Sequence, residues 1–181
     1  MKANKILVAM GVGSMLLCGS AVAADSAGSG KVTFNGEIIN APCSVDSDSV
    51  DQVVYLGQIS TKQLANGGES DEKNGKFSIK LLNCDITEKD AIKVTFSGNK
   101  DSFEPSLLVI GGQAAGAGIK MIAPGGIPVV LGQPTAAYGL TTGDNELPFT
   151  AVLKGYAVHD DTKKLIAGDF TAVTNFTLSY E

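Results

Sequence analysis

The last fourteen residues of the chain alternate between apolar and polar side chains, and this pattern constrains the fold more than any other. The odd-numbered positions from 169 to 181 are mostly polar. The even-numbered positions carry mostly apolar or small residues, which are Gly168, Phe170, Ala172, Thr174, Phe176, Leu178 and Tyr180. A two-residue period is typical of a strand that buries one face. The sequence therefore predicts a long half-buried strand over residues 168–181, whose apolar edge must be paired or protected.

Similar two-residue periods recur earlier in the chain, at residues 53–57, 77–81, 92–96, 119–123 and 149–155. Turn-forming clusters at residues 66–68, 73–75, 124–126 and 142–145 separate them. Only residues 61–65 have the pattern of a helical turn, and the chain contains 22 glycines. These features predict an all-β sandwich of antiparallel strands with Greek-key connections, in a single domain.

The N-terminus predicts export from the cytoplasm. Lys2 and Lys5 precede an apolar run at residues 6–17, and small residues at 19–23 follow it. This is the pattern of a secretory signal peptide, and its apolar run is shorter than the about 20 residues that cross a membrane. We expect cleavage after Ala23. Cys18 raises the alternative of a lipid anchor, although Leu17 stands where a lipoprotein signal has a small residue.

Removal of the signal peptide leaves two cysteines, Cys43 and Cys84. An even pair in an oxidising compartment favours a disulfide. On the chain-entropy model a loop of this length stabilises the fold by about 4 kcal/mol. A reactive thiol or a metal site is the alternative, but the chain has one histidine and no Cys-x-x-Cys spacing.

Charge and composition exclude several classes of function. The formal net charge of −5 becomes more negative once Lys2 and Lys5 are removed, so nucleic acid is not an expected partner. All fourteen basic residues are lysines, and arginine, which grips phosphate and carboxylate groups in a bidentate way, is absent. The chain is thus a poor candidate for binding phosphorylated ligands.

Three further motifs have ordinary structural explanations. His159, followed by Asp160 and Asp161, fits a polar turn better than a catalytic pair. The glycine-rich residues 111–120 lack the Gly-Lys-Ser/Thr ending of a phosphate loop. Asp46, Asp48 and Asp51 are followed by neither the glycine nor the glutamate of a calcium loop, in the required register. We therefore predict no catalytic residue, no metal, no cofactor and no small-molecule substrate.

The segment that follows the signal peptide is small and flexible at residues 25–30 and rich in β-forming residues at 32–39. A two-residue period can be traced backwards through it, along Phe34, Val32, Gly30, Gly28 and Ser26. A strand-capable arm at one end of a chain and an apolar strand edge at the other are the two parts that strand addition between molecules requires.

Three segments make the mature chain similar to the major subunits of chaperone–usher pili, the type 1 and P pilins of Gram-negative bacteria. Residues 30–45 resemble the arm, first strand and first cysteine of P-type pilins, and residues 81–86 resemble the strand with the second cysteine. At the C-terminus, Gly168 is fourteenth from the end and Tyr180 is penultimate, as in the chaperone-recognition motif of that family.

This resemblance implies an incomplete immunoglobulin-like sandwich that lacks its seventh strand and leaves a groove beside the C-terminal strand. A periplasmic chaperone would fill the groove first, and at the outer-membrane usher the arm of the next subunit would replace it. With the signal peptide at 1–23, the resemblance implies an N-terminal extension at 24–36 that is the donor strand, and a pilin domain at 37–181. The donor residues would be Ser26, Gly28, Gly30, Val32 and Phe34.

The groove and chaperone-recognition strand would consist of Gly168, Phe170, Ala172, Thr174, Phe176, Leu178, Tyr180 and Glu181, and basic chaperone residues would hold the terminal carboxylate of Glu181. The expected function is that of a structural subunit, most simply the major rod subunit, of an adhesive fibre on the surface of a Gram-negative cell. Its partners would be the chaperone, the usher, copies of itself and other pilins. A minor adaptor or terminator pilin and a free-standing extracellular binding domain are the alternatives.

Overall fold

The computed structural model describes residues 28–157 and 163–181. The predicted signal peptide, Ser26 and the turn at His159 lie outside these residues. The chain divides into two compact units, Met1–Glu37 and Ile38–Glu181. Residues 28–37 of the first unit form neither helix nor strand. All the helices and strands described below belong to the second unit.

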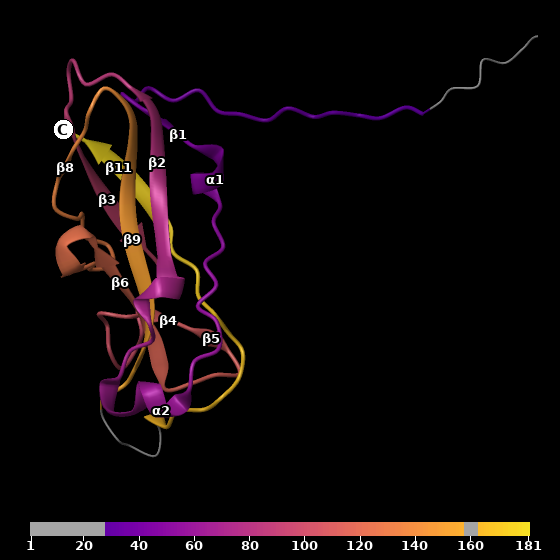
Figure 1. The fold of residues 1–181 in the computed structure, drawn as a ribbon, viewed down its shortest axis with the longest axis vertical. Helices are drawn as coiled ribbons and strands as arrows, with labels where there is room; N and C mark the ends of the chain where they lie inside the picture. The colour runs from indigo at the N-terminus through magenta and orange to yellow at the C-terminus, as the bar shows by residue number, and fades with distance from the viewer. Residues whose placement is uncertain (1–27, 158–162) are drawn as a thin grey trace, which may run out of the picture. The chain divides into compact units, whose positions relative to one another are not determined.

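The larger sheet of the second unit has six antiparallel strands in the order β1-β2-β9-β6-β4, and β7 also pairs with β6 (Figure 1). The bounds of these strands are β1 Ser44–Val45, β2 Lys76–Cys84, β9 Gly143–Gly155, β6 Ala117–Ala123, β4 Leu108–Val109 and β7 Ile127–Pro128. The long strands β2 and β9 pair from Lys76 opposite Thr150 to Cys84 opposite Gly143, with a register shift after Leu81. They form the centre of this layer.

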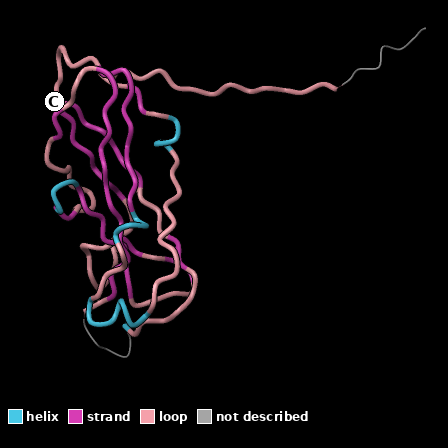
Figure 2. The backbone as a smooth tube through the Cα atoms, viewed as in Figure 1, coloured by secondary structure: helices cyan, strands magenta, loops and turns pink. Residues whose placement is uncertain are grey.

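A second layer lies behind β2 and β9 in the view of Figure 1. It consists of β11 Asn175–Tyr180, β3 Ala91–Ser97 and β8 Tyr138–Gly139, in the order β11-β3-β8. A separate two-stranded ladder joins β10 Phe170–Thr171 to β5 Gly111–Gly112. Figure 2 shows how little of the domain is helical. The predicted all-β sandwich of antiparallel strands is therefore confirmed.

The core lies between the two layers and is built around three phenylalanines. Phe96 of β3 meets Phe149 of β9 edge to face, with ring centroids 4.9 Å apart. Phe77 of β2 stacks on Phe149 at 5.6 Å. Such aromatic pairs add about 0.5–1.5 kcal/mol beyond the area they bury. Because the three rings come from both layers, this cluster holds the sandwich together.

The helical segments are single turns at the ends of the strands. They are α1 Ser47–Val50, α2 Thr61–Leu64, η1 Ala65–Gly67, η2 Glu72–Gly75 and η3 Pro124–Gly126. The turn predicted at residues 61–65 is confirmed as α2, which Ser60 caps through a hydrogen bond from the Lys62 N–H. Asp46 caps α1 by accepting from the Asp48 N–H at 2.8 Å. No helix among the described residues has the length and hydrophobicity needed to cross a membrane.

The strand predicted around residues 53–57 does not form. Val53 and Tyr55 are 71% and 81% exposed, whereas the next residue, Leu56, is half-buried and packs against the core. Side chains occupy the edge of β2 that this segment would have used, because Gln52 donates to the Ser78 carbonyl at 2.9 Å. The hydroxyl of Ser49 likewise accepts the Lys80 N–H at 3.0 Å. The segment consequently runs extended beside β2 without strand pairing.

Candidate functional site

The C-terminal strand β11 lies at the edge of its sheet. It pairs antiparallel with β3 over its whole length, from Asn175 opposite Ser97 to Tyr180 opposite Ile92. Its other edge has no strand partner within residues 28–157 and 163–181. The backbone N–H and C=O groups along that edge are consequently available to pair with another strand.

The core beside β11 is only partly covered. Phe176, Leu178 and Tyr180 point inward but remain half-buried. The β3 residues directly opposite, Phe96, Val94 and Ile92, are 1%, 0% and 0% exposed. Neighbouring residues in register share one face of a sheet, so orientation does not explain this difference. We call the unpaired edge of β11, with the side chains of Phe176, Leu178 and Tyr180, the open edge.

The single strand predicted over residues 168–181 is wrong in one respect, because the structure contains two short strands in different sheets. β10 pairs with β5, and β11 begins only at Asn175. The chain changes partner where β3 ends, and there Thr174 Oγ1 donates to the Ser97 carbonyl at 3.0 Å. The predicted alternation of buried and exposed side chains continues between the two strands, since Ala172 and Thr174 are half-buried while Val173 is 77% exposed.

Gly168 and Phe170 lie before this break, close to the glycine-rich loop. A Cβ on Gly168 would come within 2.7 Å of Gln113 Cβ. The N–H groups of Gln113 and Ala114 donate to the Asp169 carbonyl at 2.9 and 3.1 Å. Glycine at position 168 therefore allows two backbone segments to approach each other, and Phe170 packs half-buried against the core.

The last residue of the chain is held firmly by its own sheet. The N–H of Glu181 donates to the Ala91 carbonyl at 3.0 Å, and its carbonyl accepts the Ala91 N–H at 3.2 Å. Lys93 Nζ lies 2.6 Å from Glu181 Oε2. Lys89 Nζ donates to the Tyr180 carbonyl at 3.0 Å. These contacts extend the open edge to the end of the chain.

Tyr180 has a hydroxyl that is buried and has no hydrogen-bond partner in the described part of the chain. Burial raises the pKa of Tyr180 above its ordinary value. A buried polar group without a partner destabilises a folded protein. Without a partner, the Tyr180 hydroxyl therefore destabilises the folded chain.

The predicted disulfide between Cys43 and Cys84 is confirmed. Both half-cystines are buried, at 2% and 3% exposure. The Asp85 N–H donates to the Pro42 carbonyl at 2.9 Å next to the bond. The hydrogen bond from the Thr87 N–H, with a second from the Thr87 side chain, lowers the pKa of Asp85. The disulfide thus joins the segment that follows the arm to the end of β2.

A polar network lies away from the open edge, around Asp101. This carboxylate is 4% exposed and accepts hydrogen bonds from the Tyr156 hydroxyl and from the N–H groups of Phe103 and Glu104. Glu104 also pairs with Lys154. The network borders a pocket of about 190 Å³. Within the network, the side chains of Asp101, Glu104, Lys154 and Tyr156 are hydrogen-bonded or ion-paired with one another or with backbone N–H groups. It has the character of a structural network.

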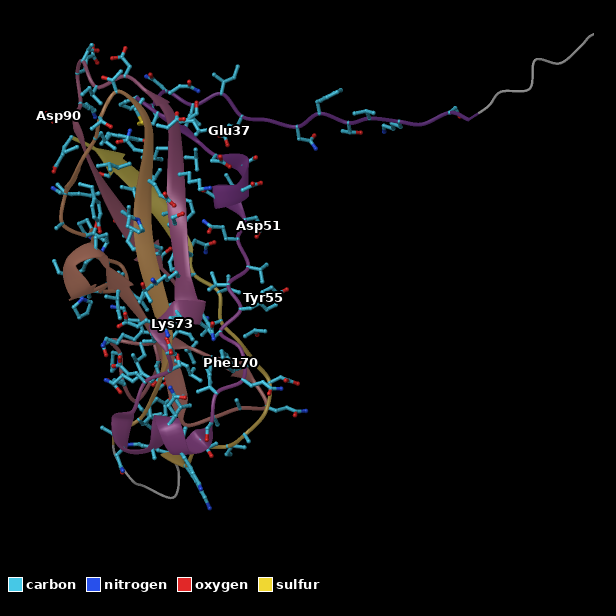
Figure 3. The ribbon with its side chains drawn as sticks, in the orientation of Figure 1. Glu37, Asp51, Tyr55, Lys73, Asp90 and Phe170 are labelled. Carbon is cyan, nitrogen blue, oxygen red and sulfur yellow. A yellow bond between two sulfur atoms is a disulfide. The ribbon has the colours of Figure 1, made fainter. Side chains whose placement is uncertain are left out.

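A second pocket, of about 310 Å³, lies between β2 and the extended segment that carries Asp51 and Tyr55 (Figure 3). It is open, and its lining contains no cysteine or histidine. Among the described residues, no group of three or more His, Cys, Asp or Glu side chains is placed to hold a metal ion.

The arm residues that the structure describes are exposed. Val32 and Phe34 are 75% and 90% exposed, and a Cβ on Gly28 or Gly30 would meet nothing within 4 Å. The same two-residue period continues forward through Gly36 to Ile38, which is fully exposed at 101%. The predicted donor residues end at Phe34, although the same alternation continues in the sequence as far as Ile38.

Comparison with known proteins gives a consistent result. The family model described as "Fimbrial protein" matches residues 32–181. Fimbria A protein of Serratia marcescens is 43% identical over the full length of both chains. The major MR/P fimbria protein of Proteus mirabilis is 41% identical, again over the full length of both.

Solved structures agree with these relatives. The crystal structure of the P pilus rod subunit PapA matches with a TM-score of 0.69 and 33% identity, covering 78% of this chain and all of that one. A chaperone–usher pilus studied for rod uncoiling gives a TM-score of 0.75 and 35% identity, covering 86% of this chain and 97% of that one.

Proposed function

Because the chain belongs to the fimbrial protein family and is a structural pilus subunit, we propose that it is the major rod subunit of its fibre and polymerises by lending its N-terminal arm to a neighbour. The main support for this proposal is the open edge. Phe176, Leu178 and Tyr180 leave the core partly uncovered beside a strand edge that has no partner in the described chain. A strand from another molecule would supply both the missing backbone pairing and the missing apolar cover.

The arm has the properties of such a strand. Its apolar side chains recur with a two-residue period at positions 32, 34 and 38, and all three are exposed in this chain. Burying one such side chain fully is worth about 1.5–3 kcal/mol, so a neighbour's groove would stabilise the arm substantially. The proposed donor residues are Ser26, Gly28, Gly30, Val32 and Phe34, and we add Gly36 and Ile38 on the exposure of the latter.

An exposed apolar strand edge promotes aggregation, so the subunit needs a cover before assembly. We propose that a periplasmic chaperone provides it by binding along Gly168–Glu181, with basic chaperone residues at the terminal carboxylate of Glu181. An outer-membrane usher would then exchange the chaperone for the next arm. The route begins with the signal peptide at 1–23, continues through the periplasm and ends at the cell surface.

In this scheme the N-terminal extension at 24–36 forms the donor strand, which continues to Ile38 at the start of the pilin domain at 37–181, and the subunit binds copies of itself and other pilins. We propose no enzymatic activity, cofactor, nucleic acid or small-molecule substrate. In support, the buried carboxylate in the described domain, Asp101, is already engaged by Tyr156 and two backbone N–H groups. A minor adaptor or terminator remains the second candidate, but the relatives with the highest coverage favour the rod, since one of them is named a major fimbria protein.

Assembly in cells that supply a matching chaperone and usher tests the proposal. The intact chain is compared with a chain lacking residues 24–30 and with a Val32→Asp/Phe34→Asp variant. Surface fibres and SDS-resistant ladders are the readouts. Both altered chains should bind chaperone but yield no ladder, because the deletion shortens the donor strand and the double substitution places charges on its groove-filling face.

A Thr33→Asp/Asn35→Asp variant is the matched control, since it places the same charges on the opposite face of the arm. It should assemble nearly as well as the intact chain. If the two double variants assemble equally well, the proposed polymerisation by the arm is wrong.

A further inference from the structure

Tyr180 differs from the other tyrosines in how its hydroxyl is accommodated. The hydroxyl of Tyr156 donates to Asp101, and that of Tyr138 is hydrogen-bonded with Thr135. Tyr55 is 81% exposed, so its hydroxyl can form hydrogen bonds with water. The Tyr180 hydroxyl alone among these four is buried without a partner in the described chain. The isolated subunit therefore leaves one hydrogen-bonding group unsatisfied next to the open edge.

The backbone around Tyr180 prevents this hydroxyl from reaching solvent by a shift of the strand. Tyr180 is paired with Ile92 of β3, and its carbonyl accepts a hydrogen bond from Lys89. Glu181 is fixed by two backbone bonds to Ala91. The end of β11 is thus held on its β3 side, and the unpaired side is the one from which another strand can approach Tyr180.

We propose that the strand filling the open edge supplies this partner, and that in the fibre it is the main chain of residues 28–30 in the arm of a second copy. This inference rests on the proposed polymerisation by the arm. It assigns to Tyr180 a role in selecting the incoming strand, because a strand whose backbone can approach the hydroxyl gains a hydrogen bond and binds more tightly.

The composition of the arm indicates why the partner is main chain. The arm positions that share a face with Val32 and Phe34 carry no polar side chain between residues 28 and 38. Every strand pair in the described sheets is antiparallel, and an antiparallel arm would place its early residues beside the end of β11. Gly28 and Gly30 occupy those positions. Glycine lacks a Cβ, so the backbone there can come close to the tyrosine.

The test compares Tyr180→Phe with the unaltered mature chain in two states. The first measurement is the unfolding midpoint of the monomer in urea. The second is the rate at which a fluorescent synthetic peptide with the sequence of residues 24–40 leaves the monomer. Removing the unsatisfied hydroxyl should raise the monomer midpoint, while loss of the intermolecular bond should speed peptide release about three- to tenfold.

Two controls sharpen the result. Tyr55→Phe removes an exposed hydroxyl and should change neither quantity. A peptide with Gly30→Val, whose side chain keeps the backbone away from Tyr180, should leave the unaltered chain and Tyr180→Phe at the same rate. The two changes should thus be coupled, as expected for groups in contact.

Each other outcome overturns the inference. A lower or unchanged midpoint for Tyr180→Phe means that the hydroxyl already has a partner in the monomer. Unchanged peptide release, in a chain that does bind the peptide, means that the arm brings no bond, and the proposed polymerisation still stands. Failure of the unaltered chain to bind the peptide at all contradicts both proposals.

Discussion

Lys93 and Glu181 form an ion pair, with Nζ 2.6 Å from Oε2, that binds the last side chain of the protein to its own sheet. Chain termini usually fray, but this one is part of an ordered strand edge. Lys89 reinforces the arrangement from the same end of β3. The ion pair therefore helps to hold the end of the open edge in place.

Lys93→Gln should destabilise the monomer by less than about 1 kcal/mol, because the two side chains are 34% and 49% exposed. The difference should disappear at about 1 M salt, where exposed charges are screened. Urea unfolding at low and high salt measures both values. Lys62→Gln, a change of an exposed lysine in α2, controls for the loss of charge. A large loss that persists at high salt would contradict this assignment.

Gly75→Ala should destabilise the fold by about 2 kcal/mol or more, since overpacking of a close contact forces the backbone apart. A Cβ at Gly75 would lie 1.7 Å from the Ala151 carbonyl oxygen. Gly139→Ala is the matched control, because a Cβ there meets nothing within 4 Å. Its effect should stay within about 0.5 kcal/mol. Thermal and urea unfolding distinguish the two, and similar losses would show that the contact at Gly75 is not tight.

Replacing both Cys43 and Cys84 by alanine should lower the free energy of unfolding by about 4 kcal/mol. The bond spans a sequence separation of 41 residues, and both sulfurs are buried. Unfolding in urea with and without a reductant provides the check. Reductant should lower the stability of the unaltered chain to near that of the double variant, and should leave the double variant unchanged. Any sensitivity of the double variant to reductant would point to a different cause.

The Tyr156 phenol should make the fold sensitive to alkali. Burial, followed by the hydrogen bond and the charge of Asp101 and the charge of Glu104, raises the pKa of Tyr156 well above its ordinary value of 10.0. The folded chain therefore holds this proton to a higher pH than the unfolded chain, so the stabilisation is complete below about pH 10 and is lost as the pH rises further.

Urea midpoints measured from pH 7 to pH 12 test this expectation. Tyr156→Phe should be less stable at pH 7, because Asp101 loses a donor, and its midpoint should fall less steeply above pH 10. Tyr55→Phe should keep the slope of the unaltered chain, since its side chain is 81% exposed. Parallel alkaline slopes for all three proteins would exclude Tyr156 as the source.

The sequence predicted local properties of the C-terminal segment well. The alternation from Phe170 to Tyr180 identified which side chains face inward, because the direction of a side chain depends only on its own strand. The split into β10 and β11 depends on where β3 ends, at Ser97, and no pattern within residues 168–181 contains that information. The disulfide was predictable because Cys43 has one possible partner in the mature chain.

Features that depend on distant residues were not predictable. Val53 and Tyr55 alternate like strand residues, yet Gln52 and Ser49 from the preceding turn occupy the edge of β2. The anchoring of the terminus joins residues 88 and 91 positions apart, Lys93 with Glu181 and Lys89 with Tyr180. The role of the arm residues themselves, from Ser26 to Phe34, stays a prediction.

The Cys43–Cys84 bond also determines how the domain would respond to pulling. Tension applied through the arm enters the domain at Cys43, five residues after Ile38, and passes through the covalent bond directly into β2. The chain between the two cysteines, which includes α1, the extended segment at 52–59 and α2, is mechanically bypassed. If subunits are joined through the arm as proposed, pulling on the fibre would leave this loop at its native length.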